Sequence, residues 1–154
     1  MASGPTERLR ELGLTLPPAP RPAGTYRPVT VDGHHAYVSG QIPNVDGRPL
    51  HPGTVGRDVD VEQAKTAAER AALQALSALA AEIGTLDRVE KIVRVGVYVA
   101  STPEFTRHAD VGNGATELLV RIFGEAGRPA RVSMGVAALP LGASVEIELL
   151  ARIA

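Results

Sequence analysis

The chain has 154 residues, a net charge of −1 and 44% hydrophobic residues, which fits one domain with a sizeable core. It contains no cysteine and only 3% aromatic residues, which excludes disulfides and thiolate metal sites and leaves a core of Ala, Val, Leu and Ile. From the near-neutral charge, and because no long apolar run and no signal-like N-terminus are visible, we expect a cytoplasmic protein that binds neither nucleic acid nor membrane.

The N-terminal part, residues 1–25, differs in composition from the rest and is expected to form an extension to a domain over 26–154. Leucines at helical spacing between Thr6 and Leu16 predict a short amphipathic helix. Four prolines then fall within residues 17–22, which favours an extended, polyproline-like arm over packed structure. A linker or mobile arm is the more typical role of such a segment.

Two strands joined by a tight turn are expected next, over residues 26–43. Alternating apolar residues flank Asp32-Gly33, a dipeptide that favours hairpin turns. Residues 44–57 are rich in Gly, Pro, Asp and Asn and are interpreted as a surface loop.

The longest predicted element is a helix that begins after Asp60 and ends at Gly84. Asp60 and Gln63 have the spacing of a capping box, and the alanines that follow recur at helical spacing. Such a small-residue face allows the helix to lie close against a sheet. The remaining pattern predicts a strand over 89–99, a helix over Pro103 to Phe123, and two further strands over 131–139 and 144–153.

The order ββ–α–β–α–ββ predicts an α+β fold in which two helices cover one face of a single sheet. In the last strand, aliphatic side chains alternate with Glu146, Glu148, Leu150 and Arg152. A sheet face with this mixture of charged and apolar groups suggests an oligomer that buries it.

Metal and nucleotide sites receive no support from the motifs. His34 and His35 are adjacent in a predicted strand, so their side chains point to opposite faces, and no two-histidine metal spacing occurs. The chain has no Gly-rich phosphate loop with a lysine and no Gly-x-Ser-x-Gly elbow. We therefore expect neither metal nor cofactor.

Two charged residues within apolar strands remain as candidates for chemistry. Arg131 offers a planar fork that matches a carboxylate, and Glu146 could orient or deprotonate a water molecule. Both could equally be solvated charges at a strand edge or a structural ion pair. If the last two strands formed a simple hairpin, the two residues would be roughly 16 Å apart at ~3.3 Å per residue. Either these strands are not neighbours, or a pocket gathers the two side chains across a subunit boundary.

Four segments together resemble the RidA family, also known as YjgF or endoribonuclease L-PSP, and within it a longer subgroup. These are Ser39-Gly40-Gln41-Ile42-Pro43, Pro129-Ala130-Arg131, Leu139-Pro140 and Val145-Glu146-Ile147-Glu148. They occur in family order, and the resemblance covers about residues 18–154. It implies a chorismate-mutase-like fold whose last strand inserts between earlier strands, and a homotrimer with clefts between subunits.

The resemblance also implies a reaction, the hydrolysis of reactive enamines and imines such as 2-aminoacrylate to 2-oxo acids and ammonia. The protein would then be a 2-iminobutanoate/2-iminopropanoate deaminase-like hydrolase acting on small carboxylate-bearing substrates. Carried over residue by residue, Arg131 would hold the substrate carboxylate and Glu146 would position the water. The substrate-binding positions would be Tyr26, Ser39, Gly40, Ser133 and Asn113, with Ser133 at a place often held by cysteine.

Two other functions stay open from the residues. The same arginine would serve a non-catalytic binder of small carboxylates, or a pathway-specific tailoring enzyme that acts on another imine. A ribonuclease or translation inhibitor, as the older family name suggests, fits less well, because the chain is slightly acidic and poor in aromatic residues for base stacking.

Overall fold

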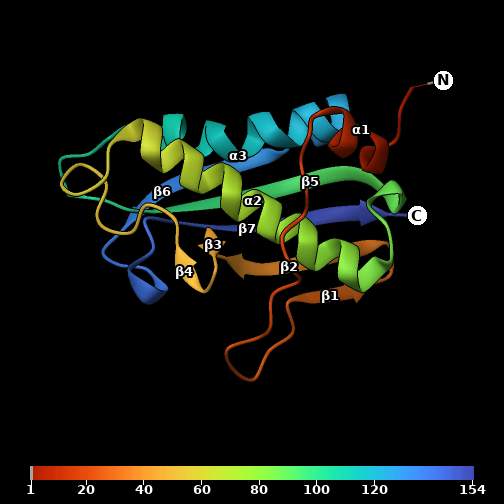
Figure 1. Ribbon diagram of the computed structural model, residues 1–154, viewed down its shortest axis with the longest axis horizontal. Helices are drawn as coiled ribbons and strands as arrows, with labels where there is room; N and C mark the ends of the chain where they lie inside the picture. Colours follow the sequence, from red (N-terminus) through yellow and green to blue (C-terminus); the bar gives the residue numbers. More distant parts are fainter. Residues whose placement is uncertain (1) are drawn as a thin grey trace.

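The computed structural model describes residues 2–154 and contains a mixed five-stranded sheet. The strands are β1 (Val29–Asp32), β2 (His35–Gln41), β5 (Val89–Ala100), β6 (Ala130–Val136) and β7 (Val145–Ile153). They lie in the order β1-β2-β7-β5-β6, and only β5 and β6 run parallel (Figure 1). The predicted loop over 44–57 contains a small hairpin of β3 (Asn44–Val45) and β4 (Arg48–Pro49).

The last strand, β7, is the centre of the sheet rather than the partner of the strand before it. It pairs antiparallel with β2 on one side and with β5 on the other. The connection from β6 crosses the end of β5 through a short turn at Pro140–Gly142. The strand that carries Arg131 and the strand that carries Glu146 are therefore not neighbours, and the simple hairpin is ruled out.

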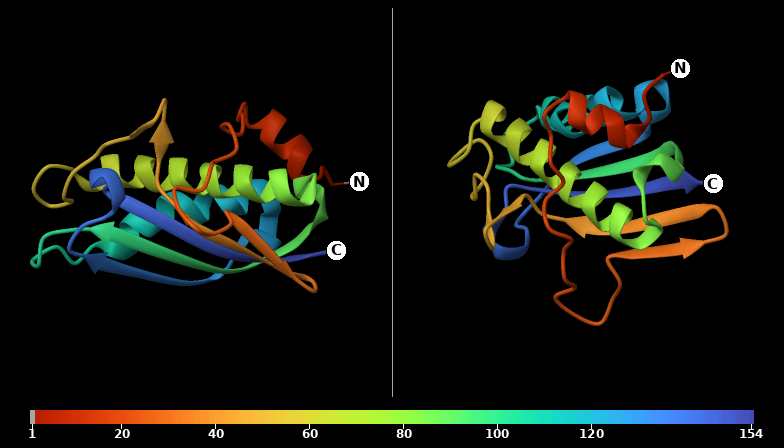
Figure 2. Two further views of the ribbon diagram at one scale, coloured as in Figure 1. Left: turned by 90° about the horizontal axis from the view of Figure 1, so that it is seen from below. Right: turned by 45° about the vertical axis from the view of Figure 1, so that its right-hand side comes forward.

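Two helices, α2 (Val61–Ile83) and α3 (His108–Phe123), cover one face of the sheet (Figure 2, left). The predicted capping box of α2 is present, with the Asp60 carboxylate and the Gln63 amide each bonded to the other's backbone N–H. The helix ends at Gly84, whose φ of 91° suits glycine. α3 begins five residues later than Pro103, because residues 102–105 form a turn closed by the Phe105 N–H and the Thr102 carbonyl.

The core between the helices and the sheet is aliphatic, as the composition predicts. The inner face of α2 is mostly alanine, and Ala64, Ala68 and Ala72 are fully buried. Because these side chains are short, α2 and α3 approach closely. At Gly114 of α3, a Cβ atom would lie only 2.1 Å from the carbonyl oxygen of Lys65 in α2. The contact between the two helices therefore requires glycine, which has no side chain, at position 114.

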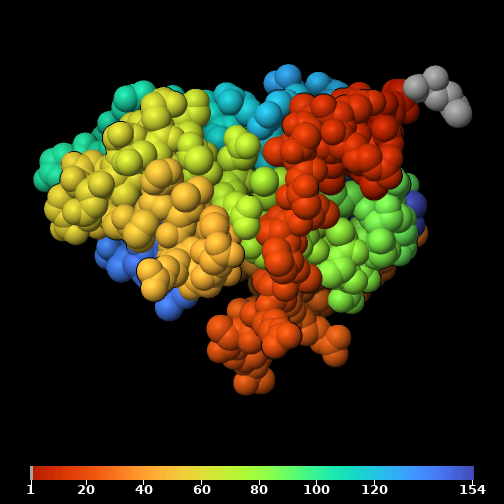
Figure 3. All heavy atoms as spheres, in the orientation of Figure 1, coloured from red at the N-terminus to blue at the C-terminus, as the bar shows by residue number. Residues whose placement is uncertain are grey.

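The N-terminal segment packs on the domain instead of forming a mobile arm. Helix α1 (Pro5–Glu11) ends before Gly13, and its Thr6 N–H donates to the Asp87 carboxylate at 3.0 Å. Further along, the carbonyls of Pro17 and Pro18 accept hydrogen bonds from Ser77 and Gln74 of α2. Figure 3 shows this segment lying across the helical layer. Proline supplies no N–H but keeps its carbonyl, so an extended Pro-rich chain can dock in this way.

None of the helices in residues 2–154 combines the length and the apolar composition that a membrane crossing requires.

Candidate active site

Arg131 lies on β6, the edge strand, and its side chain points toward α3. Its Nη1 atom donates to Asn113 Oδ1 at 2.8 Å and to Thr116 Oγ1 at 3.2 Å. Both partners are neutral, and the guanidinium forms no ion pair with any residue in the described part of the chain. Arg131 is half-buried, so its positive charge is oriented but not neutralised. An arrangement of this kind favours an external anion.

Ser133 follows Arg131 on the same side of β6 and lies under α3. Its hydroxyl is buried and has no hydrogen-bond partner among residues 2–154. A Cβ atom on Gly112 would lie 2.5 Å from Ser133 Oγ and 3.1 Å from Arg131 Nη1, so the glycine lets the helix pass close to both side chains. Buried hydroxyls normally have partners, and an unpartnered one beside a free cation is a feature of functional sites. Arg131, Asn113, Thr116 and Ser133 form what we call the arginine cluster.

The arginine cluster opens onto a surface groove. The groove has a volume of about 500 Å³ and is bounded by one side of α3 and by the chain that leads into β6. It is lined by Asn113, Thr116, Glu117, Val120, Arg121, Arg128, Pro129 and Arg131. A solute can therefore reach Arg131 from solvent.

Glu146 lies on the other face of the sheet. In the register, Glu146 pairs with Tyr98 of β5, whereas Arg131 pairs with Val95, three residues earlier on the same strand. Because alternate residues of a strand face opposite sides, Arg131 shares the helix side with buried Val95, and Glu146 shares the open side with Tyr98. A single chain does not bring the two predicted catalytic residues together.

The Glu146 carboxyl lies against the backbone of β2. A Cβ atom at Gly40 would overlap its carboxyl oxygen, so glycine is required there. Partial burial raises the pKa of Glu146, and the nearby Glu148 carboxylate raises it further. A carboxylate with a raised pKa accepts a proton more readily near neutral pH, which suits a general base.

Glu148 belongs to a small polar network on the open face that sequence reasoning missed. The Tyr98 hydroxyl donates to Glu148 Oε1 at 2.8 Å, and Arg94 Nη1 lies 3.6 Å from the same oxygen. The hydrogen bond to the Glu148 carboxylate is the main reason that the pKa of Tyr98 is raised. These three residues come from two strands whose pairing no local pattern reveals. Beside them is a depression of about 450 Å³ that Tyr37 and Leu150 also line.

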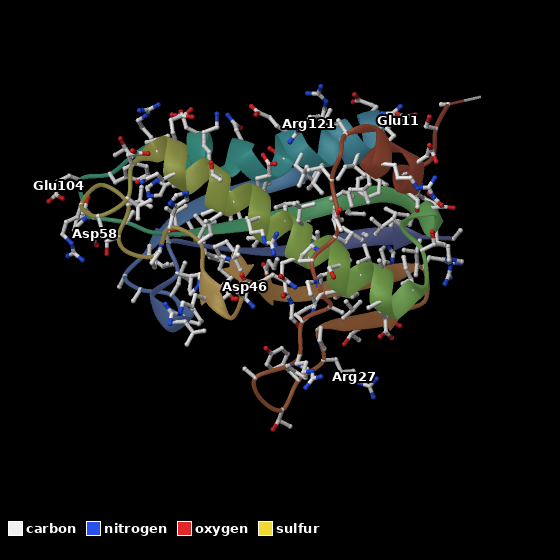
Figure 4. All side chains as sticks on the ribbon, viewed as in Figure 1. Glu11, Arg27, Asp46, Asp58, Glu104 and Arg121 are labelled. Carbon is white, nitrogen blue, oxygen red and sulfur yellow. The ribbon has the colours of Figure 1, made fainter. Side chains whose placement is uncertain are left out.

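The side chains of Tyr26 and Ser39 both form hydrogen bonds with backbone atoms of the segment that precedes β1. Ser39 Oγ donates to the Arg27 carbonyl at 2.7 Å, and the Tyr26 hydroxyl accepts the Ala23 N–H at 3.2 Å. The loop that carries Tyr26 projects from the body of the molecule, with Arg27 near its base (Figure 4), and half of the Tyr26 surface is exposed. Gly40, next to Ser39, thus lies against Glu146, while the Tyr26 side chain packs on its own projecting loop.

The predicted site residues therefore form two groups. Asn113 and Ser133 join Arg131 on the helix side, and Ser39 and Gly40 accompany Glu146 at the other side. Thr116 was missed, although it lies one helical turn from Asn113 and so shares its face. Within residues 2–154, no three His, Asp or Glu side chains converge to hold a metal ion.

Comparison with known proteins gives a consistent match over nearly the whole chain. The family model described as "YjgF/chorismate mutase-like, putative endoribonuclease" matches residues 6–153. Protein TCP17 of Trypanosoma cruzi is 41% identical over 146 residues, which cover 94% of this chain and 91% of the relative. A 2-iminobutanoate/2-iminopropanoate deaminase of Dermatophagoides farinae is 31% identical over 136 residues, covering 88% and 91%.

The fold has a close counterpart among solved structures. A protein of unknown function from Agrobacterium tumefaciens is 42% identical and superposes with a TM-score of 0.90 over 97% of this chain and 92% of that one. The N-terminal helix is thus inside the matched region, because both the family model and this structure extend to it.

Proposed function

The chain belongs to the RidA/YjgF family, and on that premise we propose that it hydrolyses reactive 2-imino acids, and the enamines that tautomerise to them, to 2-oxo acids and ammonia. The observation that carries the proposal is the Arg131 guanidinium, which is held by neutral partners and accessible from a groove. The named activity of the Dermatophagoides relative agrees with it.

The hydrogen bonds of Arg131 within the described part of the chain use only one of its three nitrogen atoms, and the other two are free to bind a carboxylate. A guanidinium has five N–H donors, and the two on Nη1 are directed to Asn113 and Thr116. The Nε and Nη2 donors remain, and together they match the two oxygens of a carboxylate. Arg131 would therefore hold the substrate carboxylate and fix the position of the adjacent C=N carbon.

Glu146 would act on the water. The water oxygen adds to the imine carbon while the Glu146 carboxylate takes one of its protons. That proton is passed to the nitrogen, which gives a carbinolamine with one hydroxyl and one amino group. Glu146 then takes the remaining hydroxyl proton and delivers it to the nitrogen as the C–N bond breaks, so ammonia leaves while the C=O bond of the 2-oxo acid forms. The raised pKa of Glu146 suits both halves of this exchange.

The site would be completed by a second copy of the chain. Because Arg131 and Glu146 face opposite sides of one sheet, they can meet only if different subunits supply them. A homotrimer with clefts between subunits fulfils this condition, with the arginine cluster from one subunit and Glu146, Ser39 and the Tyr26 loop from the next. Two exposed apolar side chains on the open face, Tyr37 and Met134, support an assembly that covers it.

The test is ammonia release from 2-aminoacrylate generated in the assay. The purified protein should accelerate the appearance of ammonia and pyruvate beyond the spontaneous rate, with and without a metal chelator. A rate equal to the spontaneous one would contradict deamination. In that case, pyruvate binding that depends on Arg131, measured by calorimetry, would identify a non-catalytic carboxylate binder.

A further inference from the structure

The groove beside Arg131 is larger than a small imino acid requires. 2-Aminoacrylate has six non-hydrogen atoms, which at no more than ~30 Å³ each fill less than half of the 500 Å³. The rest of the groove extends away from Arg131 along α3 and toward the start of β6. Its far part is bounded by Val120, Arg121 and Arg128.

The charges that line the groove are mostly positive. Three arginines, Arg121, Arg128 and Arg131, contribute to its walls, against one carboxylate, Glu117. Glu69 and Glu125 lie beside Arg121 and Arg128 without being part of the lining, so the positive excess applies to the groove walls and not to their surroundings. A ligand with two anionic groups would be attracted more strongly than one with a single carboxylate.

Arg128 is available for a ligand. Its Nε atom lies 3.3 Å from Glu125 Oε2, but the side chains are 67% and 86% exposed, and such surface pairs contribute little to stability. Arg121 is less free, because its Nη2 atom lies 3.4 Å from Glu69 Oε2 and both side chains are more buried. Arg121, labelled in Figure 4, is on α3, whereas Arg128 precedes Arg131 on the same stretch of chain.

The spacing of Arg128 and Arg131 suits a short ligand with an acid at each end. Three residues of extended chain separate their Cα atoms by about 10 Å. Pro129 between them restricts the backbone, while both side chains are long enough to turn toward the groove. Two guanidinium groups can therefore converge on carboxylates joined by a short carbon chain.

We propose that this groove selects 2-imino acids with a second carboxylate, of four or five carbons, such as 2-iminosuccinate or 2-iminoglutarate. Arg131 holds the carboxylate next to the imine, and Arg128 holds the distal one. The inference rests on the proposed deamination and adds its substrate class. Arg128 is then a specificity-determining residue that acts on binding rather than on the water.

The experiment compares two substrates in three proteins. Each imine is generated in the assay by an amino-acid oxidase or lyase, and kcat/KM is measured for the wild type, Arg128→Gln and Arg10→Gln. Arg10 is a matched control, since it forms an exposed i,i+3 pair with Glu7 on α1, outside the groove. The wild type should prefer the dicarboxylic imine by about tenfold or more over 2-aminoacrylate, because charge-assisted hydrogen bonds are the strong ones. Arg128→Gln should lower this ratio about tenfold, and Arg10→Gln should leave it unchanged.

Calorimetry with the stable 2-oxo acids separates this proposal from the proposed function. 2-Oxoglutarate should bind the wild type more tightly than pyruvate, and Arg128→Gln should remove the difference. If neither imine is hydrolysed but this binding preference holds, deamination is wrong and the selectivity stands. If the wild type shows no preference, or Arg128→Gln keeps it, the selectivity is overturned whether or not the protein is a deaminase.

Discussion

Arg131 differs from the other arginines near it in having only neutral partners. Arg121 and Arg128 each lie near a glutamate, while Arg131 is held by an amide oxygen and a hydroxyl. In a half-buried position such as that of Arg131, a structural role would be met by a carboxylate partner that neutralises the charge, whereas the exposed pair of Arg128 and Glu125 is weak and leaves Arg128 able to exchange partners. The local chemistry thus supports the proposed ligand-binding role of Arg131 over that of a strand-edge charge.

Replacing Arg131 by Ala should lower kcat/KM for 2-aminoacrylate by at least about 10²-fold. Two charge-assisted hydrogen bonds to the substrate carboxylate are lost, each worth about 1.5–3 kcal/mol, and ~1.4 kcal/mol corresponds to one decade. Arg131→Lys should recover only part of the rate, because an ammonium group has no planar fork. Circular dichroism should show both variants folded. Wild-type turnover in a folded Arg131→Ala protein would show that the arginine is only a surface charge.

Glu146 should make stability fall as pH rises. Its pKa is raised in the folded state, so between its usual value and the raised one the folded protein binds more protons than the unfolded chain. The slope of the unfolding free energy with pH is negative in that interval, and the contribution is lost as pH passes the raised pKa. Glu146→Gln removes this dependence, so its stability relative to the wild type should increase with pH.

Asp87 should give the opposite pH dependence of the unfolding free energy in the same series of denaturation experiments. The Thr6 N–H is the largest cause that lowers the pKa of Asp87, so its contribution is present at neutral pH and is lost as pH falls through the lowered value. Asp87→Asn should therefore be less stable than the wild type at neutral pH and approach it in acid. A Glu146→Gln difference that stays flat with pH, while Asp87→Asn responds, would remove the argument for a perturbed Glu146.

At the scale of elements, Gly114 shows how the fold depends on one close approach. An Ala in a helix interior is normally about 1 kcal/mol better than Gly. Here the added Cβ would meet the Lys65 carbonyl oxygen at 2.1 Å and push α2 and α3 apart. Gly114→Ala should therefore destabilise the protein by about 1–3 kcal/mol, as overpacked cores do.

Chemical denaturation of Gly114→Ala checks this sign directly. Glu117→Ala and Glu117→Gly, at an exposed position of the same helix, give the effect of helix propensity alone. In that pair the alanine variant should be the more stable. Should Gly114→Ala also be the more stable form, the helices are not as closely packed as the structure has them.

Individual helices and strands can be predicted from residues close together in sequence, whereas the contacts between these elements cannot. Asp60, Gln63 and Gly84 define α2 because caps act over one turn of helix. The start of α3 was misplaced because Pro103 is favourable at the start of a helix but here belongs to a turn. The polyproline segment was expected to be mobile because the partners of its carbonyls, Gln74 and Ser77, are distant in sequence.

The candidate site likewise contains residues that the sequence predicts and residues that it does not. Arg131, Asn113 and Ser133 could be proposed from the family resemblance, and the structure places them together. The central position of β7 was also expected from the resemblance and is confirmed. Gly112 and the Tyr98–Glu148 pair could not be found, because their roles depend on which strands and helices become neighbours.

At the scale of the whole molecule, the proposed site requires more than one subunit, because its two halves lie on opposite faces of the sheet. The helices cover one face of the sheet, and the open face carries Glu146 together with exposed Tyr37 and Met134. A monomer would leave these apolar side chains in water and the two proposed catalytic residues, Arg131 and Glu146, apart. The trimer proposed above solves both problems with one contact, and light scattering should give about three times the chain mass of 16.1 kDa.

Mixing two inactive variants tests the shared cleft most directly. Arg131→Ala and Glu146→Gln should each be inactive alone and trimeric. When they are unfolded and refolded together in equal amounts, a cleft is intact if its arginine comes from a Glu146→Gln subunit and its glutamate from an Arg131→Ala subunit. Random assembly gives this combination in about one cleft in four, so about a quarter of the wild-type activity should return. If mass spectrometry shows mixed trimers and no activity returns, Arg131 and Glu146 do not act in one cleft between subunits, and the account is wrong.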